Sequence, residues 1–216
     1  MPEMQKKAVT CPSCSEEGLM EVWTGVNVGI EPMWKEKVGS REIFTYTCPH
    51  CQAKITVAYD FLYHDPQGNY MIYLLPGGGG RSFDSIDGLS AEKLEGYCLR
   101  EVSDINGLLE KVMLFDDGLD DRCIEICKLY LSEQYAAQNK GKKLFGIYYN
   151  GKSEDGSFLE FFLFGEGGEM CGTKLPIQVY DKVFLKLCGS EFDRTDEYRI
   201  DFQWAVSAFE HGILAK

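Results

Sequence analysis

Short runs of apolar residues, separated by turn-forming residues, dominate the first third of the chain. β-branched and aromatic residues cluster in runs that predict strands at 21–28, 43–47, 55–62 and 70–75. Residues 32–38 are long enough for one or two helical turns, which Gly39 ends. Residues 65–69, Asp-Pro-Gln-Gly-Asn, have the composition of a turn between the last two strands. This part of the chain is therefore predicted to be mainly β.

Helical periodicity becomes prominent after residue 97. A strand at 97–102 is followed by a helix that Ser103 caps, with apolar residues at helical spacing from Ile105 to Met113. Further elements are predicted as helices at 120–137, 176–187 and 204–210, and as strands at 142–149, 158–164 and 198–202. Helices and strands mixed in this order predict an α+β fold.

The clearest interruption of these patterns lies at Pro76 and the four glycines 77–80. The glycines lack the Gly-Lys-Ser/Thr ending of a phosphate-binding loop, so we interpret them as a linker or surface loop. The predicted organisation is a β segment at 1–76, a Gly-rich linker at 77–96 and an α+β domain at 97–216.

Two C-x-x-C motifs stand in the β segment, Cys11-Pro12-Ser13-Cys14 and Cys48-Pro49-His50-Cys51. Each motif supplies two sulfurs from one tight turn, and four thiolates complete a tetrahedral Zn²⁺ site. The flanking strands place each motif at the tip of a β-hairpin, which predicts a zinc-ribbon-like segment with paired knuckles. A site with four protein ligands has no open position, so a zinc held by Cys11, Cys14, Cys48 and Cys51 is expected to be structural.

The spacing of the two motifs departs from common zinc-binding patterns. Thirty-three residues separate Cys14 from Cys48, whereas roughly 15–20 are usual. The predicted strand and short helix between them account for the excess as an insertion. Ser15 and Gln52 follow the motifs, at positions where glycine often helps such a turn.

Cys-Pro-His-Cys also matches an oxidising thiol–disulfide motif, and this gives an alternative function. A thiol–disulfide oxidoreductase using Cys48 and Cys51 would need Cys48 at a helix N-terminus, where the dipole stabilises its thiolate. Residues 52–59 have instead the pattern of a strand, and no thioredoxin-like βαβ unit precedes the motif. We therefore favour the zinc interpretation.

Composition restricts the compartment and the partners. The net charge is −12, and an acidic chain without a basic patch argues against binding nucleic acid. Nine cysteines, an odd number, favour a metal site in a reducing environment over a disulfide framework. Residues 1–10 lack an apolar signal-peptide core, and no apolar run approaches the roughly 20 residues of a membrane span. We expect a cytoplasmic protein without a membrane anchor.

Other groups that carry chemistry have simpler interpretations. Five cysteines outside the motifs are expected to be buried like apolar residues: Cys98, Cys123, Cys127, Cys171 and Cys188. His64-Asp65 is interpreted as a strand end that enters a turn. In the acidic cluster Asp116–Asp121, Asp120 and Asp121 are interpreted as helix-capping residues, with Arg122 pairing with one of them.

The alternative for His64 and the acidic cluster is a metal-dependent enzyme, in which they would bind Mg²⁺ or Ca²⁺. The cluster lacks the alternating spacing and the distal Glu of a calcium loop. The chain also lacks the G-x-S-x-G, H-E-x-x-H and kinase motifs. We therefore expect a protein that binds rather than catalyses.

Several segments resemble the CpXC family of bacterial and archaeal proteins, which is named for its paired C-P-x-C motifs. The resemblance includes both motifs and 44–47, continues through Tyr63-His64-Asp65, 71–76, 99–102 and 110–111, and ends with 116–122 and 124–128. It implies that the four cysteines act as one unit and that two segments are linked. It implies no substrate, and it raises the hypothesis that Tyr63-His64-Asp65 and residues 116–122 form a shared surface.

These observations lead to one functional hypothesis. The chain is expected to be a zinc-stabilised binding or adaptor protein whose partner is another protein. The sequence leaves its oligomeric state and the identity of the partner open.

Overall fold

The computed structural model describes residues 4–77, 83, 94–190, 192 and 197–212. The chain forms two compact units, Met1–Leu109 and Glu110–Lys216. Among the described residues, no helix combines the length and apolar character needed to cross a membrane.

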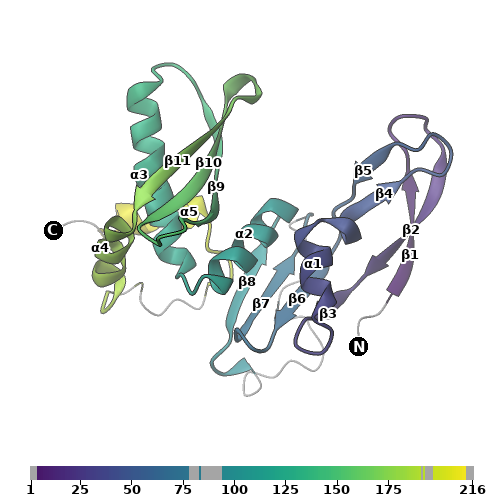
Figure 1. Ribbon diagram of the computed structural model, residues 1–216, viewed down its shortest axis with the longest axis horizontal. Helices are drawn as coiled ribbons and strands as arrows, with labels where there is room; N and C mark the ends of the chain where they lie inside the picture. Colours follow the sequence, from purple (N-terminus) through teal and green to yellow (C-terminus); the bar gives the residue numbers. More distant parts are fainter. Residues whose placement is uncertain (1–3, 78–82, 84–93, 191, 193–196, 213–216) are drawn as a thin grey trace. The chain divides into compact units, whose positions relative to one another are not determined.

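Two antiparallel hairpins form one part of the first unit (Figure 1). Strand β1 (Met4–Thr10) pairs with β2 (Glu17–Trp23), and β4 (Thr45–Thr47) pairs with β5 (Lys54–Thr56). Helix α1 (Met33–Gly39) and the 3-10 turn η1 (Glu42–Phe44) lie between the hairpins along the chain. The α1 helix confirms the predicted helical turns at 32–38.

A four-stranded sheet forms the other part of the first unit. Its strands are β3 (Gly25–Asn27), β6 (Phe61–Asp65), β7 (Tyr70–Leu74) and β8 (Cys98–Val102), in the order β3-β6-β7-β8. The central pair is antiparallel, whereas β3 and β8 run parallel to their neighbours. All five residues of β7 are buried, so this strand is the centre of the core.

Two predicted strands are each divided into two elements. The run 21–28 becomes β2 and β3, which belong to different sheets, and 55–62 becomes β5 and the start of β6. The chain joins β6 at Gly25, where only glycine allows the two backbones to approach this closely. A Cβ there would lie 2.8 Å from the carbonyl oxygen of Leu62 on β6. The strand predicted at 97–102 is present as β8, but it pairs with β7 in the first unit rather than with the elements that follow it. Most of the predicted linker at 77–96 lies outside the described residues.

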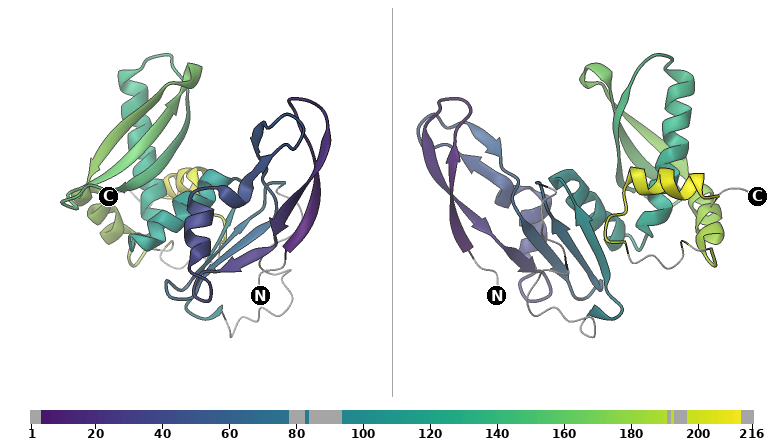
Figure 2. Two further views of the ribbon diagram at one scale, coloured as in Figure 1. Left: turned by 45° about the vertical axis from the view of Figure 1, so that its right-hand side comes forward. Right: turned by 180° about the vertical axis from the view of Figure 1, so that it is seen from behind.

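The second unit packs helices against a three-stranded antiparallel sheet (Figure 2). Helix α2 (Ile105–Asp116) crosses from the first unit into the second. The other elements of the second unit are α3 (Asp121–Gln138), β9 (Leu144–Lys152), β10 (Phe158–Gly165), the turn η4 (Glu166–Gly168), β11 (Met170–Pro176), α4 (Ile177–Leu187) and α5 (Phe202–Glu210). The strands are in the order β11-β10-β9. Residues Ile147, Leu159, Phe161 and Leu163 of the sheet share one apolar core with residues of α3, α4 and α5.

The ends of three helices test the predicted caps. Asp120 is the N-cap of α3, as predicted, and its Oδ1 accepts a hydrogen bond from the Arg122 N–H at 2.9 Å. At α2 the capping side chain is Asp104 instead of the expected Ser103, because Asp104 Oδ1 accepts from the Gly107 N–H. The strand predicted at 198–202 is wrong: Asp201 caps α5, accepting from two backbone N–H groups, so the chain enters a helix there.

Five ionisable side chains are buried together in the second unit, and we name them the buried charge cluster: Glu110, Lys111, Asp121, Glu125 and Lys128. Lys111 Nζ donates to Asp121 at 2.7 Å and to the carbonyl oxygen of Ile200 at 2.7 Å. Lys128 Nζ donates to Glu110 at 2.8 Å and to Glu125 at 2.9 Å. Asp121, predicted as a capping residue, is therefore held inside this cluster.

The cluster also completes the edge of the sheet, since Glu110 accepts a hydrogen bond from the backbone N–H of Tyr149 on β9. Burial raises the pKa of Glu110, although Lys128 opposes the shift. Burial also opposes the charge of Lys128, but the attraction of Glu110 and Glu125 outweighs it and raises the pKa of Lys128. The ammonium group of Lys128 therefore stays charged because its carboxylate partners are in place.

Replacement of one lysine of the cluster should strongly destabilise the second unit. Lys111→Met removes the partner of the buried Asp121 and of the Ile200 carbonyl, and such a loss costs about 3–5 kcal/mol. Urea unfolding followed by circular dichroism measures it. Lys142→Met is the matched control, because the pair of Lys142 with Glu169 is exposed and should contribute about 1 kcal/mol or less. Equal losses in both variants would contradict the assignment.

Candidate metal centre

The two C-x-x-C motifs form turns of the same conformation. The first hook, Cys11–Cys14, joins β1 to β2, and the second hook, Cys48–Cys51, joins β4 to β5 (Figure 1). In the first hook the Cys11 N–H donates to the Glu16 carbonyl at 2.9 Å, and the Ser15 N–H donates to the Cys11 carbonyl at 2.8 Å. The second hook repeats both bonds at Cys48, Ala53 and Gln52. The prediction that each motif lies at the tip of a hairpin is confirmed.

The hooks bring four sulfur atoms together. All four Sγ atoms lie within 4.8 Å of one another. Two separations join one hook to the other, at 3.6 Å between Cys11 and Cys51 and 3.7 Å between Cys14 and Cys48. A tetrahedral site with metal–sulfur bonds of about 2.3 Å requires sulfurs roughly 3.8 Å apart. The cluster could therefore hold a metal ion, and four sulfur donors suit zinc or iron.

Hydrogen bonds within the cluster shift the pKa values of Cys11 and Cys14 in opposite directions. Burial raises the pKa of Cys11, but hydrogen bonds from the N–H groups of Ser13 and Cys14 and from neighbouring thiols outweigh it and lower the pKa to about 6. A backbone hydrogen bond at Glu16 lowers the pKa of Cys14, but burial and the other three cysteines raise it to about 12. The Cys11 thiol is thus more acidic than the Cys14 thiol, and a metal cation would favour the thiolate form of the cysteines that bind it.

Tyr46 is a residue of the site that the sequence did not point to. Its hydroxyl group is buried and has no hydrogen-bond partner among the described residues. Burial and the charges of the four hook cysteines raise the pKa of Tyr46, so the hydroxyl remains a donor. Gly18 leaves the space for it, because a Cβ at Gly18 would lie 1.9 Å from the Tyr46 oxygen. A buried hydroxyl group normally donates a hydrogen bond, and a cysteine thiolate of the hooks would be a suitable acceptor for Tyr46.

Comparison with known proteins gives one match. The sequence model of the family described as CpXC protein matches residues 9–128, more than half of the chain. This chain belongs to the CpXC family. No curated protein and no solved structure gives a significant match. The CpXC match contains both hooks, so the four cysteines lie within the region that defines the membership.

Other cysteines of this CpXC protein take no part in the site. Cys123 and Cys127 are buried, as predicted, and burial raises the pKa of Cys127 to about 12. The same prediction is wrong for Cys171 and Cys188, which are exposed, while Cys98 is half-buried. Cys171 lies on the edge strand β11, and Cys188 directly follows the last residue of α4.

The remaining candidate residues have the simpler roles expected for them. His64 and Asp65 end β6, and Asp65 Oδ1 accepts from the N–H groups of Gln67 and Gly68 in the following turn. Arg122 pairs with Asp120 at 2.6 Å, as predicted. Within the described residues, the hook cysteines are the one group of His, Cys, Asp or Glu side chains close enough together to bind a metal. His64 and the acidic cluster form no such group there.

Hydrogen bonds determine which nitrogen of His64 carries the proton. Asn27 Oδ1 accepts from the N–H groups of Gly29 and Ile30, which orients the Asn27 amide nitrogen toward His64 Nδ1 at 3.1 Å. Nδ1 is therefore an acceptor, and the proton is on Nε2, which lies 3.3 Å from the Tyr97 hydroxyl. Burial lowers the pKa of His64, although Asp65 opposes the shift.

Glycine in place of the residue that directly follows each hook, Ser15 or Gln52, should stabilise the first unit. Ser15 and Gln52 both adopt left-handed backbone conformations, each with φ of 62°, which are unfavourable for residues with a Cβ. Ser15→Gly and Gln52→Gly should each raise the free energy of unfolding by about 0.5–1 kcal/mol. Thermal and urea unfolding would show it. The control Ser15→Ala keeps the Cβ, so a similar gain in that variant would count against the explanation.

The stability of the first unit should fall as the pH falls below the pKa of about 6.5 of an unfolded histidine. In that range His64 binds a proton more readily in the unfolded chain than in the folded chain, so acid favours unfolding. The readout is the free energy of unfolding at pH 7.5 and 5.5 for the native chain and for His64→Gln. Acid effects on the cysteines are common to both proteins. A pH dependence that is the same in both would show that His64 does not contribute.

Proposed function

We propose that this CpXC protein is a cytoplasmic binding or adaptor protein, and that Cys11, Cys14, Cys48 and Cys51 hold one structural Zn²⁺. The observation that carries the proposal is the convergence of four sulfurs from two matching hooks at separations that suit a tetrahedral ion. Zinc has no redox chemistry of its own and is the usual ion of structural four-cysteine sites. Such sites need thiolates, which persist in the reducing cytoplasm.

A structural role follows from the size of the hairpins. Strands β4 and β5 have three residues each, and an isolated hairpin of this size is not stable in water. A metal bound to both hooks joins this hairpin to the longer one formed by β1 and β2. Metal binding then contributes directly to folding, as in other small zinc-binding segments.

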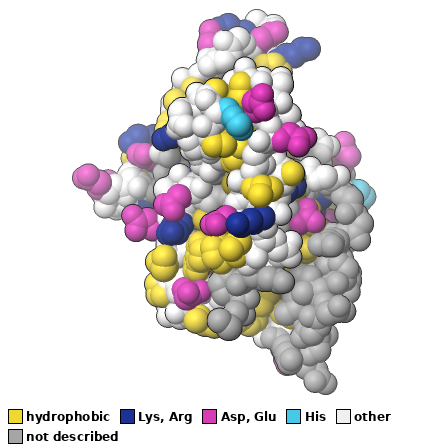
Figure 3. Space-filling model, turned by 90° about the vertical axis from the view of Figure 1, so that its right-hand side faces the viewer, with side chains coloured by type: hydrophobic (Ala, Val, Ile, Leu, Met, Phe, Trp, Pro, Cys, Tyr) yellow, Lys and Arg dark blue, Asp and Glu magenta, His cyan; other side chains and the backbone are white. Residues whose placement is uncertain are grey.

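The proposed partner is a protein. A closed metal site has no position for a substrate, and the net charge of −12 opposes binding to phosphate backbones. Figure 3 shows hydrophobic side chains gathered between charged side chains of both signs on one face of the molecule. Exposed apolar residues of the first unit include Leu19 and Ile30, which are 66% and 74% exposed. Apolar surface with a charged border is typical of protein-binding surfaces.

The thiol–disulfide alternative has less support. The second hook lies between two strands, so Cys48 lacks the helix N-terminus that activates such cysteines. The four sulfurs also lie within 4.8 Å of one another, whereas a redox centre would need only Cys48 and Cys51.

Elemental mass spectrometry of protein purified under reducing conditions without chelator should find one zinc per chain. The variant Cys11→Ser/Cys14→Ser should lose the zinc and the cooperative unfolding of the first unit, because two ligands cannot hold the ion against water. The matched control Cys171→Ser/Cys188→Ser changes two exposed cysteines and should keep both. A strong chelator should unfold the first unit of the native chain and of this control.

Two results would overturn the proposal. One is a metal-free protein in which Cys48 and Cys51 form a disulfide that cycles under mild oxidant, which would make the chain a redox protein. The other is an enzymatic turnover by protein whose fold does not require the hook cysteines.

A further inference from the structure

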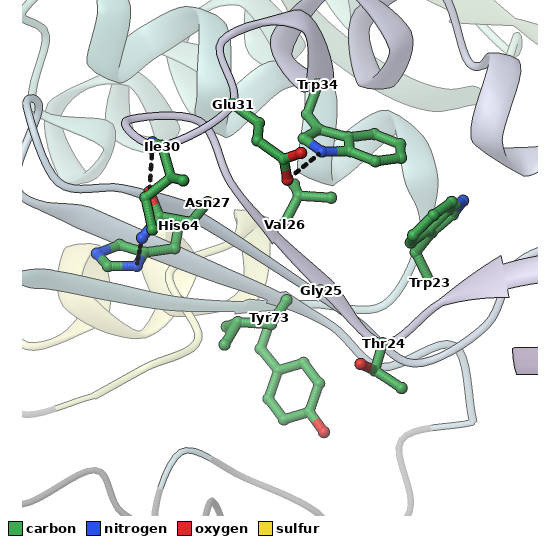
Figure 4. Close-up of a pocket in the computed structure, with 11 residues that line it drawn as sticks. Trp23, Thr24, Gly25, Val26, Asn27, Ile30, Glu31, Trp34, His64 and Tyr73 are labelled. Carbon is green, nitrogen blue, oxygen red and sulfur yellow. Dashed lines mark hydrogen bonds between the residues drawn. The ribbon is translucent and has the colours of Figure 1, made fainter. Parts of the chain in front are cut away.

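A cavity of about 710 Å³ lies in the first unit, at the edge strand β3 and the loop that leads from it to α1 (Figure 4). We name it the β3 pocket. Its volume is in the range of small-molecule sites, which is about 300–1,000 Å³. All residues that line it are among the described residues of the first unit, and none is a ligand of the metal centre.

Aromatic side chains form much of the wall of the β3 pocket. The indole rings of Trp23 and Trp34 meet edge to face, with centroids 4.6 Å apart and planes inclined by 61°. Tyr73 of β7 and Leu62 of β6 contribute from the sheet. Trp34 and Tyr73 are buried, whereas Trp23 is only half-buried, so part of its ring remains available to a ligand.

Glu31 supplies the one negative charge in this wall. Its Oε2 accepts a hydrogen bond from the Trp34 indole N–H at 3.1 Å, which holds the carboxylate beside the rings (Figure 4). The backbone N–H of Glu31 donates to the Asn27 carbonyl at 3.0 Å, so the loop that carries Glu31 is fixed to β3. The carboxylate is therefore positioned before any ligand arrives.

No positive charge lines the pocket to balance Glu31. The lining residues include no lysine and no arginine. Their one histidine is His64, whose pKa is lowered and whose protons are placed as in the neutral ring. An anion would be repelled, and a neutral ligand would take water away from the carboxylate without replacing its hydrogen bonds.

The protein already places one cation against this aromatic pair. Lys37, which is not a lining residue, has its Nζ 5.4 Å from the centroid of the Trp34 ring, and Glu42 pairs with the same ammonium group at 3.2 Å. Tryptophan is the aromatic side chain that attracts cations most strongly. With one cation already at Trp34, the half-buried ring of Trp23 is the better platform for a second.

We propose that the β3 pocket binds an organic cation, an ammonium or guanidinium group that lies against Trp23 and pairs with Glu31. The cation has two possible sources, a free small molecule or a lysine or arginine side chain of a protein. In the second case the pocket would be part of the protein-binding surface proposed above, but the binding of a cation does not depend on that function.

The direct test compares two probes of the same shape on the full-length, metal-loaded protein. Choline carries a quaternary ammonium group, and 3,3-dimethylbutan-1-ol is its neutral isostere. Isothermal titration calorimetry and tryptophan fluorescence should show choline binding about tenfold more tightly, as expected for a cation at a partly desolvated aromatic and carboxylate site. Equal measurable affinities of the two probes would overturn the proposal, and so would failure of both probes together with the two peptides described below.

Variants separate the charge from the aromatic wall. Glu31→Gln keeps an acceptor for the Trp34 indole and should reduce choline affinity about tenfold while leaving the neutral probe unchanged. Trp23→Ala should abolish detectable choline binding. The control Glu36→Gln removes an exposed acidic residue of α1 that does not line the pocket, and it should bind choline as the native chain does.

Metal content and melting temperature, measured for each variant, identify any that fails to fold. If Glu31→Gln and Glu36→Gln bind choline alike, Glu31 has no role.

A second pair of probes distinguishes the sources. The blocked tripeptide Ala-Lys-Ala is compared with the same peptide carrying norleucine, the neutral analogue of lysine. Binding of the lysine peptide more tightly than choline would assign the pocket to a protein side chain, and the reverse order would assign it to a free small molecule. Failure of all four probes refutes the pocket proposal while leaving the zinc measurement, and the function inferred from it, unaffected.

Discussion

The convergence of four cysteine sulfurs is the constraint on which the first unit depends. The two hooks come from hairpins that are far apart in sequence, and 33 residues between them are closed into a loop when the sulfurs meet. Closing such a loop costs conformational entropy, and the three-residue strands β4 and β5 bury too little apolar surface to offset it. A bound metal ion, as proposed above, would supply the missing free energy. The shared turn conformation of the hooks, with Ser15 and Gln52 left-handed, is the local condition that aims both pairs of sulfurs at one point.

A different kind of constraint holds the second unit, and it shows that the CpXC match is not a complete folding unit. The match ends at residue 128, inside α3, and it contains all members of the buried charge cluster. Yet Lys111 requires the carbonyl of Ile200, and Glu110 requires the N–H of Tyr149, both from the part of the chain beyond the match. Buried charges without these partners would be strongly destabilising. A chain truncated at residue 128 would therefore lose these two partners, the end of α3 and most of the apolar core against which α3 packs.

Sequence patterns identified strands with many buried apolar residues, such as β7, and missed strands with few of them. Strands β1 and β11 were missed, because each has only one buried residue and so shows no apolar alternation. Both are edge strands, whose position is determined by pairing with β2 and β10 rather than by their own composition. The 198–202 run has apolar and aromatic residues, but Asp201 accepts from two backbone N–H groups, and this local capping outweighed strand propensity. Asp121 could not be distinguished from a cap, because its partner Lys111 comes from another helix.

The same contrast applies to the two candidate sites. The candidate metal centre was predictable because its cysteines form two short C-x-x-C motifs, a spacing that is typical of metal-binding sites. The β3 pocket was not, since its wall combines β3 and the following loop with residues of β2, α1, β6 and β7, which only the tertiary fold brings together. One signal was nevertheless present in the spacing. The segment between the hooks is longer than a four-cysteine site needs, and it contains Trp23, Glu31 and Trp34. The residues that the metal does not require are those that build the pocket, so metal binding would support a second site by holding both ends of this segment.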